Sequence, residues 1–377
     1  MRAATDAKCE LENMADHSVS RRLPVWWEAA HKFLEMQKID ASRTSIGSEH
    51  IDGATQMSAT DGTSGGEAQA GDVQGQIGFG RLVALMSSPD MPKSFGSPFL
   101  GAVVVPELGL EPMLVPSPAR VQDADRCPAI PGFLNDLLRE RAARQFWRRL
   151  HDGDPSPILI TQGDSWLHYP VWRRDIADRL SGCCNVLPVG RTFERPEQLA
   201  PGLRDVIANL KRYGREPAAY VLSIGASTIL SDAFAVAGFS DPVPASGFPL
   251  PNYQSLIERY IRGIRAVSPG LRIAIHGYGR FIPMDGWLSA AMIGAGLRES
   301  IARERFGIGV GDAVVTTLSR FGAPDGQGAS PGVFVIDNRD LLTERRDWAD
   351  EVHPSEEVCD LIADRMVEIL RLNGGLE

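Results

Sequence analysis

The chain has 377 residues and a mass of 41.0 kDa, which is enough for one large domain or two of ordinary size. Hydrophobic residues make up 43% of it and charged residues 23%, so a wholly disordered or collagen-like chain is excluded. The formal net charge of −9 argues against a nucleic-acid-binding protein, because such proteins usually carry an excess of basic residues.

The cysteines and the apolar stretches of the sequence indicate the cellular compartment in which we expect the protein. The sequence has 5 cysteines, an odd number, and no Cys-x-x-Cys pair that would indicate a zinc ribbon or a thioredoxin-like site. This usage favours a reducing, cytoplasmic compartment. The first residues include acidic ones where a signal peptide needs an apolar run, and no apolar stretch approaches the roughly 20 residues that span a bilayer. We therefore expect a cytoplasmic protein without a membrane span.

The first 130 residues show little regular patterning. Residues 24–39 have apolar side chains at helical spacing and predict a short amphipathic helix. Residues 41–76 are rich in Gly, Ser, Thr, Ala and Asp and predict a flexible linker. Residues 79–132 are apolar but interrupted by Pro and Gly, which favours irregular extended structure. We predict that residues 1–130 are a poorly structured N-terminal extension, through which a protein partner could bind.

A different pattern begins at residue 131. Residues 132–150 predict a helix with one apolar side, and its arginines are more typical of a solvated face than of a binding patch. Short apolar runs then alternate with helical patterns. Strands are predicted at 158–161, 186–189, 219–223, 273–276 and 333–336, and helices at 171–181, 198–213, 253–267, 287–305 and 355–372. Residues 131–377 thus predict a three-layer α/β/α, flavodoxin-like domain with a parallel central sheet.

The segment Gln162-Gly163-Asp164-Ser165-Trp166 directly follows the first of these strands. Active sites of such sheets lie at the carboxyl ends of the strands, so this turn places the Ser165 hydroxyl where chemistry is expected. The N-terminal amides of the helix that follows favour negative charge, as on a developing oxyanion. The alternative is a serine that only caps the helix, with a glycine for the tight turn.

A second segment, Asp350-Glu351-Val352-His353-Pro354, lies near the C-terminal end of the sequence. Among 7 histidines, only His353 has an aspartate three residues before it. A carboxylate at this offset can hold the imidazole by its Nδ1–H and leave Nε2 as a base. The alternative is a capping aspartate followed by an exposed histidine. The sequence therefore predicts a serine hydrolase triad that consists of Ser165, His353 and Asp350.

Residues 157–372 also resemble the SGNH/GDSL hydrolase superfamily, in its bacterial Gly-Asp-Ser-Trp form. The first block of this resemblance is residues 163–170, and the last is residues 348–354. Asn185 to Glu194 and His276-Gly277-Tyr278 are similar to two intermediate blocks. The resemblance implies an esterase that acts on a small-molecule or glycan ester through an acyl-enzyme, with no metal or organic cofactor.

The resemblance also implies an oxyanion hole. It assigns the backbone N–H groups of Ser165 and Gly190 to this hole, together with a third donor that is an asparagine in the family and Ser227 here. A serine hydroxyl is shorter than an amide arm, and losing one such donor typically lowers turnover by about 10²–10³. Two readings therefore stay open: an active or weakened esterase, and a degenerate SGNH-fold protein that binds a ligand or partner.

Three further side chains are candidates for contacts with substrate. Trp166 and His168 follow Ser165 directly, and Tyr278 follows a predicted strand. His168 could equally pack under the next helix, and Tyr278 could equally belong to a structural turn. The glycine-rich segment 307–311 lacks the spacing of a dinucleotide-binding loop, and we interpret it as a turn.

Overall fold

The computed structural model describes much of the chain beyond residue 75. The described residues are 76–88, 90–91, 93–103, 113–126, 132–168, 174–189, 196–237, 248–284, 286–323, 330–374 and 376. The chain divides into two units, Met1–Gly71 and Asp72–Glu377, and all described residues belong to the second. The predicted helix at 24–39 lies outside the described residues, as does all of the predicted linker except Gln76.

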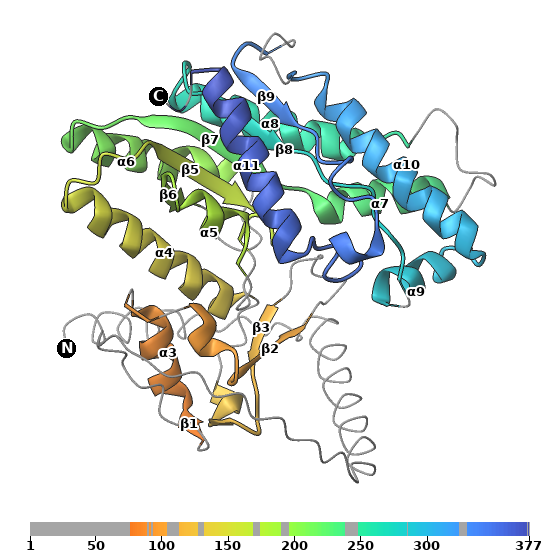
Figure 1. Ribbon diagram of the computed structural model, residues 1–377, viewed down its shortest axis with the longest axis horizontal. Coiled ribbons are helices and arrows are strands. Elements are labelled where there is room, and N and C mark those ends of the chain that lie inside the picture. The colour runs from red at the N-terminus through yellow and green to blue at the C-terminus, as the bar shows by residue number, and fades with distance from the viewer. Residues whose placement is uncertain are drawn as a thin grey trace, which may run out of the picture. The chain divides into compact units, whose positions relative to one another are not determined.

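A five-stranded parallel sheet forms the centre of this unit (Figure 1). Its strands, in the order β6-β5-β7-β8-β9, are β6 (Asn185–Pro188), β5 (Ile158–Gly163), β7 (Pro217–Ser223), β8 (Ile273–His276) and β9 (Val333–Ile336). Every residue of β6, β8 and β9 is buried. Parallel strands are covered on both faces, so a continuous run of Val, Ile and Leu suits them better than an alternating pattern. The predicted parallel sheet is confirmed.

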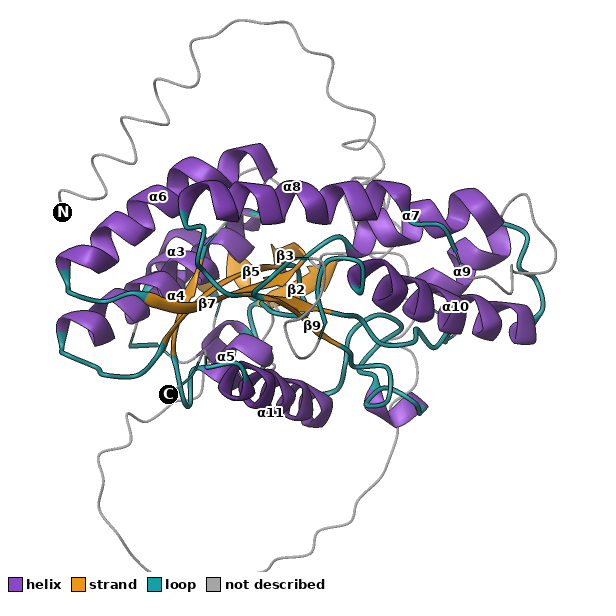
Figure 2. Ribbon diagram, turned by 90° about the horizontal axis from the view of Figure 1, so that it is seen from above, coloured by secondary structure: helices purple, strands orange, loops and turns teal. Residues whose placement is uncertain are grey.

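Helices cover both faces of this sheet. Figure 2 shows α5 and α11 on one face and α6 and α8 on the other. The helices are α4 (Phe133–His151), α5 (Ile176–Leu180), α6 (Pro196–Arg212), α7 (Ala226–Ala237), α8 (Pro251–Val267), α9 (Trp287–Gly294), α10 (Ser300–Leu318) and α11 (Glu356–Leu372). This is the predicted three-layer α/β/α arrangement. None of the helices described is long and apolar enough to cross a membrane.

The strand order creates a site at one edge of the sheet. From β5 the chain passes to β6 on one side and then returns to β7 on the other. At such a switch point the loops diverge and leave a crevice outside the carboxyl ends of the strands. The loop after β5, which contains Ser165, therefore lies at the position in the fold where a ligand is expected.

The described residues between 77 and 126 have more regular structure than the Pro and Gly content of this region predicts. They form α3 (Phe79–Ser87) and the short strands β1 (Ile77–Gly78), β2 (Leu100–Val103), β3 (Met113–Pro116) and β4 (Val121–Gln122). In α3, Leu82 and Met86 are buried one helical turn apart. They belong to a second apolar cluster to which α4 contributes Leu134 and Leu137. A domain boundary at residue 130 stays a prediction.

We expected a turn at the glycine-rich segment 307–311. The segment is instead part of α10, so this prediction was wrong. Its glycines are explained by packing. A Cβ on Gly307 would overlap the backbone carbonyl oxygen of Phe281, and a Cβ on Gly311 would lie 2.7 Å from the carbonyl oxygen of Gly279. Glycine thus lets α10 approach the backbone of the segment that follows β8, at the same edge of the sheet as Ser165.

We expect Gly307→Ala to lower the free energy of unfolding by about 1–3 kcal/mol, because the added methyl group must displace the backbone at Phe281. Gly202, in α6, has no heavy atom within 4 Å of its would-be Cβ, so Gly202→Ala is the matched control and should stabilise by up to about 1 kcal/mol. Urea unfolding measures both changes. A Gly307→Ala protein as stable as the unmodified chain would contradict this packing.

Candidate active site

The turn after β5 is held by backbone hydrogen bonds. The N–H of Asp164 donates to the carbonyl oxygen of Ser223 on β7 at 2.7 Å. The N–H groups of Leu167 and His168 donate to the carbonyl oxygen of Asp164 at 3.1 Å each. A Cβ on Gly163 would lie 2.7 Å from the Ser223 carbonyl oxygen, so only glycine fits at the end of β5. These contacts fix the backbone on both sides of Ser165.

The structure brings Ser165, His353 and Asp350 together. The Oγ of Ser165 lies 2.7 Å from Nε2 of His353, although the two residues are 188 positions apart. On the other side of the ring, Nδ1 lies 2.9 Å and 2.8 Å from the two carboxylate oxygens of Asp350. Ser165 and His353 are buried, whereas 43% of the Asp350 side chain is exposed. The order Ser–His–Asp is that of a nucleophile, a base and a group that orients the base.

The Asp350 carboxylate is stabilised in its charged form. Burial acts to raise its pKa, but this is outweighed by the hydrogen bond from the His353 ring, the His353 charge and two backbone N–H groups, so the pKa of Asp350 lies below its ordinary value. The two N–H groups are those of Val352 and His353, each 2.9 Å from Oδ1. An ionised carboxylate in this position holds the Nδ1–H tautomer and leaves the Nε2 lone pair directed at Ser165.

A second carboxylate, Asp164, lies beneath the turn. Its Oδ1 accepts hydrogen bonds from the Ser223 hydroxyl at 3.1 Å and from the Trp166 N–H at 3.2 Å, and its Oδ2 accepts one from the Tyr278 hydroxyl. Desolvation raises the pKa of Asp164, and these hydrogen bonds, like the His353 charge, act in the opposite direction. Asp164 therefore ties β5, β7 and the segment after β8 together behind Ser165.

His276, the last residue of β8, completes this buried layer. Its Nδ1 lies 3.3 Å from the Ser223 hydroxyl, and among the described residues its Nε2 has no hydrogen-bond partner. Burial lowers the pKa of His276 to about 3, so the ring is neutral near pH 7. The Trp166 ring packs on it, with ring centres 5.0 Å apart, and packs edge-on against Tyr278 at 5.1 Å.

The three residues predicted to contact substrate occupy different places. Tyr278 is fully buried with its hydroxyl directed at Asp164, so it supports the turn and does not form an open pocket wall. Trp166 is also buried, although it borders a small cavity of about 10 Å³ together with Ser165 and His353. The Nε2 of His168 lies 2.9 Å from the Thr161 hydroxyl, and His168 lines a larger cavity.

The predicted oxyanion donors are only partly described. Gly190 lies outside the described residues. Ser227 is exposed in the first turn of α7, two residues after Gly225, whose φ of 96° lies in the left-handed region that favours glycine. The contribution of Gly190 and Ser227 to an oxyanion hole stays a prediction.

Glu351, between Asp350 and His353, was not predicted to matter. Its buried carboxylate accepts four backbone N–H groups, from Met284 at 3.0 Å, Gly286 at 3.2 Å, Leu288 at 2.6 Å and Ser289 at 3.0 Å. These donors belong to the start of α9 and the segment before it, so Glu351 fastens the loop of Asp350 and His353 to another part of the fold. In the sequence, its place inside the Asp-x-x-His motif was the only signal, and its partners lie more than 60 residues away.

We expect Glu351→Gln to lower the free energy of unfolding by about 1–3 kcal/mol. A carboxamide has one oxygen to accept hydrogen bonds, and its NH₂ group would face backbone donors that are then left unsatisfied. Glu357→Gln is the matched control, since Glu357 is exposed in the first turn of α11, and it should change stability by less than about 1 kcal/mol. Equal effects in urea unfolding would contradict the role given to Glu351.

Because burial lowers the pKa of His276, we expect the free energy of unfolding to depend on pH. Its pKa is about 3 in the folded chain and about 6.5 when unfolded, so between these values the unfolded state binds a proton that the folded state does not. This contribution to stability is therefore complete above pH 6.5 and is lost as the pH falls toward 3. Between about pH 7.5 and pH 5 the loss from this group is roughly 2 kcal/mol.

The test is urea unfolding at both pH values, for the unmodified chain and for His276→Asn. The substitution keeps a polar group near the Ser223 hydroxyl but removes the titration, so His276→Asn should lose roughly 2 kcal/mol less on acidification. Identical pH dependence in the two proteins would show that His276 does not resist protonation in the folded state.

Within the described ranges, no group of three or more His, Cys, Asp or Glu side chains is placed to hold a metal ion. The sulfurs of the adjacent Cys183 and Cys184 are 3.6 Å apart.

In comparisons with known proteins, no family model and no curated protein matches the sequence. Several solved structures are similar in fold. A member of the lipolytic G-D-S-L family from Veillonella parvula is 17% identical, with 56% of this chain and 97% of that one covered and a TM-score of 0.32. A family 3 carbohydrate esterase from Clostridium thermocellum is 15% identical (57% and 98% covered, TM-score 0.32). A phospholipase A1 from Streptomyces albidoflavus is 12% identical (57% and 98% covered, TM-score 0.35).

Their descriptions name a lipolytic G-D-S-L protein, a carbohydrate esterase and a phospholipase A1. At identities and TM-scores this low, the activity of the present chain has to be inferred from its own residues.

Proposed function

We propose that the chain is a serine ester hydrolase in which Ser165 is the nucleophile, His353 the general base and acid, and Asp350 the group that orients His353. The observation that carries this proposal is the continuous hydrogen-bonded arrangement from Ser165 Oγ through the His353 ring to the Asp350 carboxylate, with distances of 2.7 Å and 2.8 Å. It lies at the carboxyl end of β5, beside the switch point of the sheet.

The chemistry follows from these positions. His353 Nε2 takes the proton of the Ser165 hydroxyl as Oγ attacks the ester carbonyl, and the Asp350 carboxylate stabilises the imidazolium that forms. The imidazolium then gives this proton to the leaving alcohol, which leaves an acyl group on Ser165. A water molecule, deprotonated by His353, attacks the acyl carbon, and the proton returns to Ser165 Oγ as the acid departs.

The negative oxygen of the tetrahedral intermediate needs hydrogen-bond donors. We assign these to the backbone N–H groups of Ser165 and Gly190, with the Ser227 hydroxyl as the third donor. Ser227 is suited to this role by its exposure and by its place in the first turn of α7, directly after the carboxyl end of β7. Because a hydroxyl reaches less far than an asparagine amide, we expect slower turnover than in a hydrolase with the asparagine.

Covalent labelling tests the proposal directly. A fluorophosphonate probe should modify the unmodified chain at Ser165, and Ser165→Ala should abolish both labelling and the hydrolysis of 4-nitrophenyl acetate. Asp350→Asn should keep Ser165 in place but lower turnover by about 10³–10⁴, because an amide no longer favours the required tautomer and imidazolium charge. Ser319→Ala, an exposed serine at the end of α10, is the matched control and should label and turn over like the unmodified chain.

The alternative is a degenerate fold member that binds a ligand or a partner without turnover, and the serine at position 227 is the observation in its favour. It predicts a folded chain that no fluorophosphonate modifies at Ser165. That result, with unfolding behaviour that shows an intact fold, would overturn the assignment as a hydrolase.

A further inference from the structure

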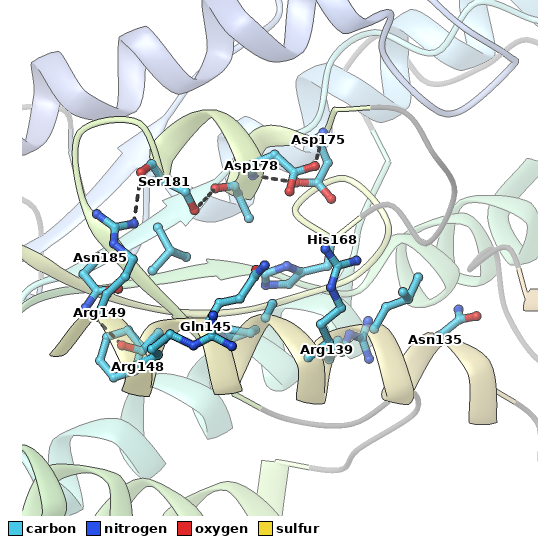
Figure 3. Close-up of a pocket in the computed structure, with 17 residues that line it drawn as sticks. Asn135, Arg139, Gln145, Arg148, Arg149, His168, Asp175, Asp178, Ser181 and Asn185 are labelled. Carbon is cyan, nitrogen blue, oxygen red and sulfur yellow. Dashed lines mark hydrogen bonds between the residues drawn. The ribbon is translucent and has the colours of Figure 1, made fainter. Parts of the chain in front are cut away.

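A cavity of about 350 Å³ lies between α4, α5 and the edge strand β6 (Figure 3). We call it the α4 pocket. Figure 3 shows the side chains of Arg139, Gln145 and His168 between α4 and the first turn of α5, where Asp175 caps the helix and Asp178 follows. None of these five residues takes part in the chemistry proposed for Ser165, so the role of the pocket is a separate question.

The α4 pocket adjoins the proposed nucleophile. Asp175 lines both this pocket and the small cavity that contains Ser165 and His353. Arg139 Nη2 donates a hydrogen bond of 3.2 Å to the carbonyl oxygen of Gly163, two residues before Ser165. Two residues of chain span at most about 7 Å. The pocket therefore lies close to the backbone of Ser165, and Asp175 borders both cavities.

Two guanidinium groups in the pocket are buried, contrary to the solvated arginine face that the sequence favoured. Arg139 and Arg141 are only 9% and 8% exposed. Among the described residues, Nε of Arg141 has no hydrogen-bond partner, while its Nη2 donates to the carbonyl oxygen of Met91. Burial lowers the pKa of Arg141, against the opposing effect of the Asp178 charge. A buried cation with an unused N–H donor favours an anionic ligand.

The opposite end of the pocket is already occupied by contacts within the chain. Arg149 donates to the Asp154 carboxylate at 2.6 Å and to the carbonyl oxygens of Ser181 and Cys184 at 3.2 Å each. Arg148 pairs with Asp90 at 2.7 Å. The unused donor therefore belongs to Arg141, in the half of α4 that also carries Arg139 and its contact with the loop of Ser165.

Acidic groups limit how much negative charge the pocket accepts. Asp175 and Asp178 form a capping box, in which each carboxylate accepts the backbone N–H of the other residue. Asp136 lies 3.7 Å from Arg139. With these carboxylates nearby, a singly charged group is favoured over a doubly charged phosphate, because a second negative charge adds repulsion in a site of low dielectric constant.

We propose that the α4 pocket binds the carboxylate of an ester substrate, so that the enzyme prefers monoesters of short dicarboxylic acids, or esters with a carboxylate at a similar distance, over neutral esters. The carboxylate accepts hydrogen bonds from Arg141 Nε and from Arg139, while the ester carbonyl lies at Ser165. This inference rests on the proposed function, since it assigns a substrate class to the same nucleophile.

The first test compares two nearly isosteric substrates. Mono-4-nitrophenyl glutarate carries a carboxylate, and 4-nitrophenyl glutaramate carries a neutral amide in its place. We expect kcat/KM to be at least about 10-fold higher for the glutarate, which is the effect of one hydrogen bond to a charged group. Arg141→Met should reduce this ratio at least about 10-fold, mainly through KM for the glutarate.

Arg144→Met is the matched control. Arg144 lies on the same helix, is exposed and does not line the pocket, so the ratio should stay that of the unmodified chain. Equal kcat/KM for the two substrates, or an unchanged ratio in Arg141→Met, would overturn the proposal while leaving the hydrolase assignment intact.

The second test does not depend on turnover. The Ser165→Ala variant is titrated calorimetrically with monoethyl glutarate and with ethyl glutaramate. It should bind the glutarate at least about 10-fold more tightly. Adding Arg141→Met to this variant should remove the difference in affinity. Selective binding together with no fluorophosphonate labelling would support the pocket and overturn the hydrolase assignment. Equal affinity for both compounds would overturn the pocket.

Discussion

The hydrogen bond between Ser165 Oγ and His353 Nε2 joins two loops that are 188 residues apart, so it forms only if both loops are held in place independently. Each loop has its own carboxylate for this purpose. Asp164 accepts hydrogen bonds from Ser223, Trp166 and Tyr278 beneath the turn of Ser165. Glu351 accepts four backbone N–H groups from residues 284–289 and so fastens the loop of His353. The parallel sheet brings the loops to one edge, and the carboxylates fix their geometry.

The three carboxylates near Ser165 illustrate how the surroundings of an acid decide what it does. Asp350 has the exposed side chain and the imidazole partner, and its pKa is lowered, which suits a charged group that orients a base. Asp164 is half-buried beside the hydroxyl groups of Ser223 and Tyr278, and desolvation raises its pKa. Glu351 is buried too, but it has backbone N–H groups as partners and no contact with the ring of His353 among those described. The same loop thus carries two neighbouring acids with different roles. Asp350 orients the His353 ring, and Glu351 anchors the loop.

Much of the fold and the Ser165, His353 and Asp350 arrangement followed from local sequence patterns. Buried parallel strands are continuous apolar runs, and the predicted strands at 273–276 and 333–336 coincide with β8 and β9. The offset between Asp350 and His353 is set within one loop, so spacing alone predicts their contact. The helix α7 was not predicted. The glycines of α10 and the four donors to Glu351 depend on segments distant in the sequence, which no local pattern can identify.

The arginines of α4 show most clearly that a local sequence pattern cannot identify contacts with distant segments. An amphipathic pattern identifies the apolar stripe of a helix, but it does not say which of the remaining residues a neighbouring element covers. Because α4 contributes Leu134 to one apolar cluster and Phe146 to the other, parts of its polar surface are enclosed as well. Arg139 and Arg141 are buried there, in a cavity beside the turn of Ser165. Burying the unpaired Nε of Arg141 costs stability, which a ligand that accepts its hydrogen bond would restore.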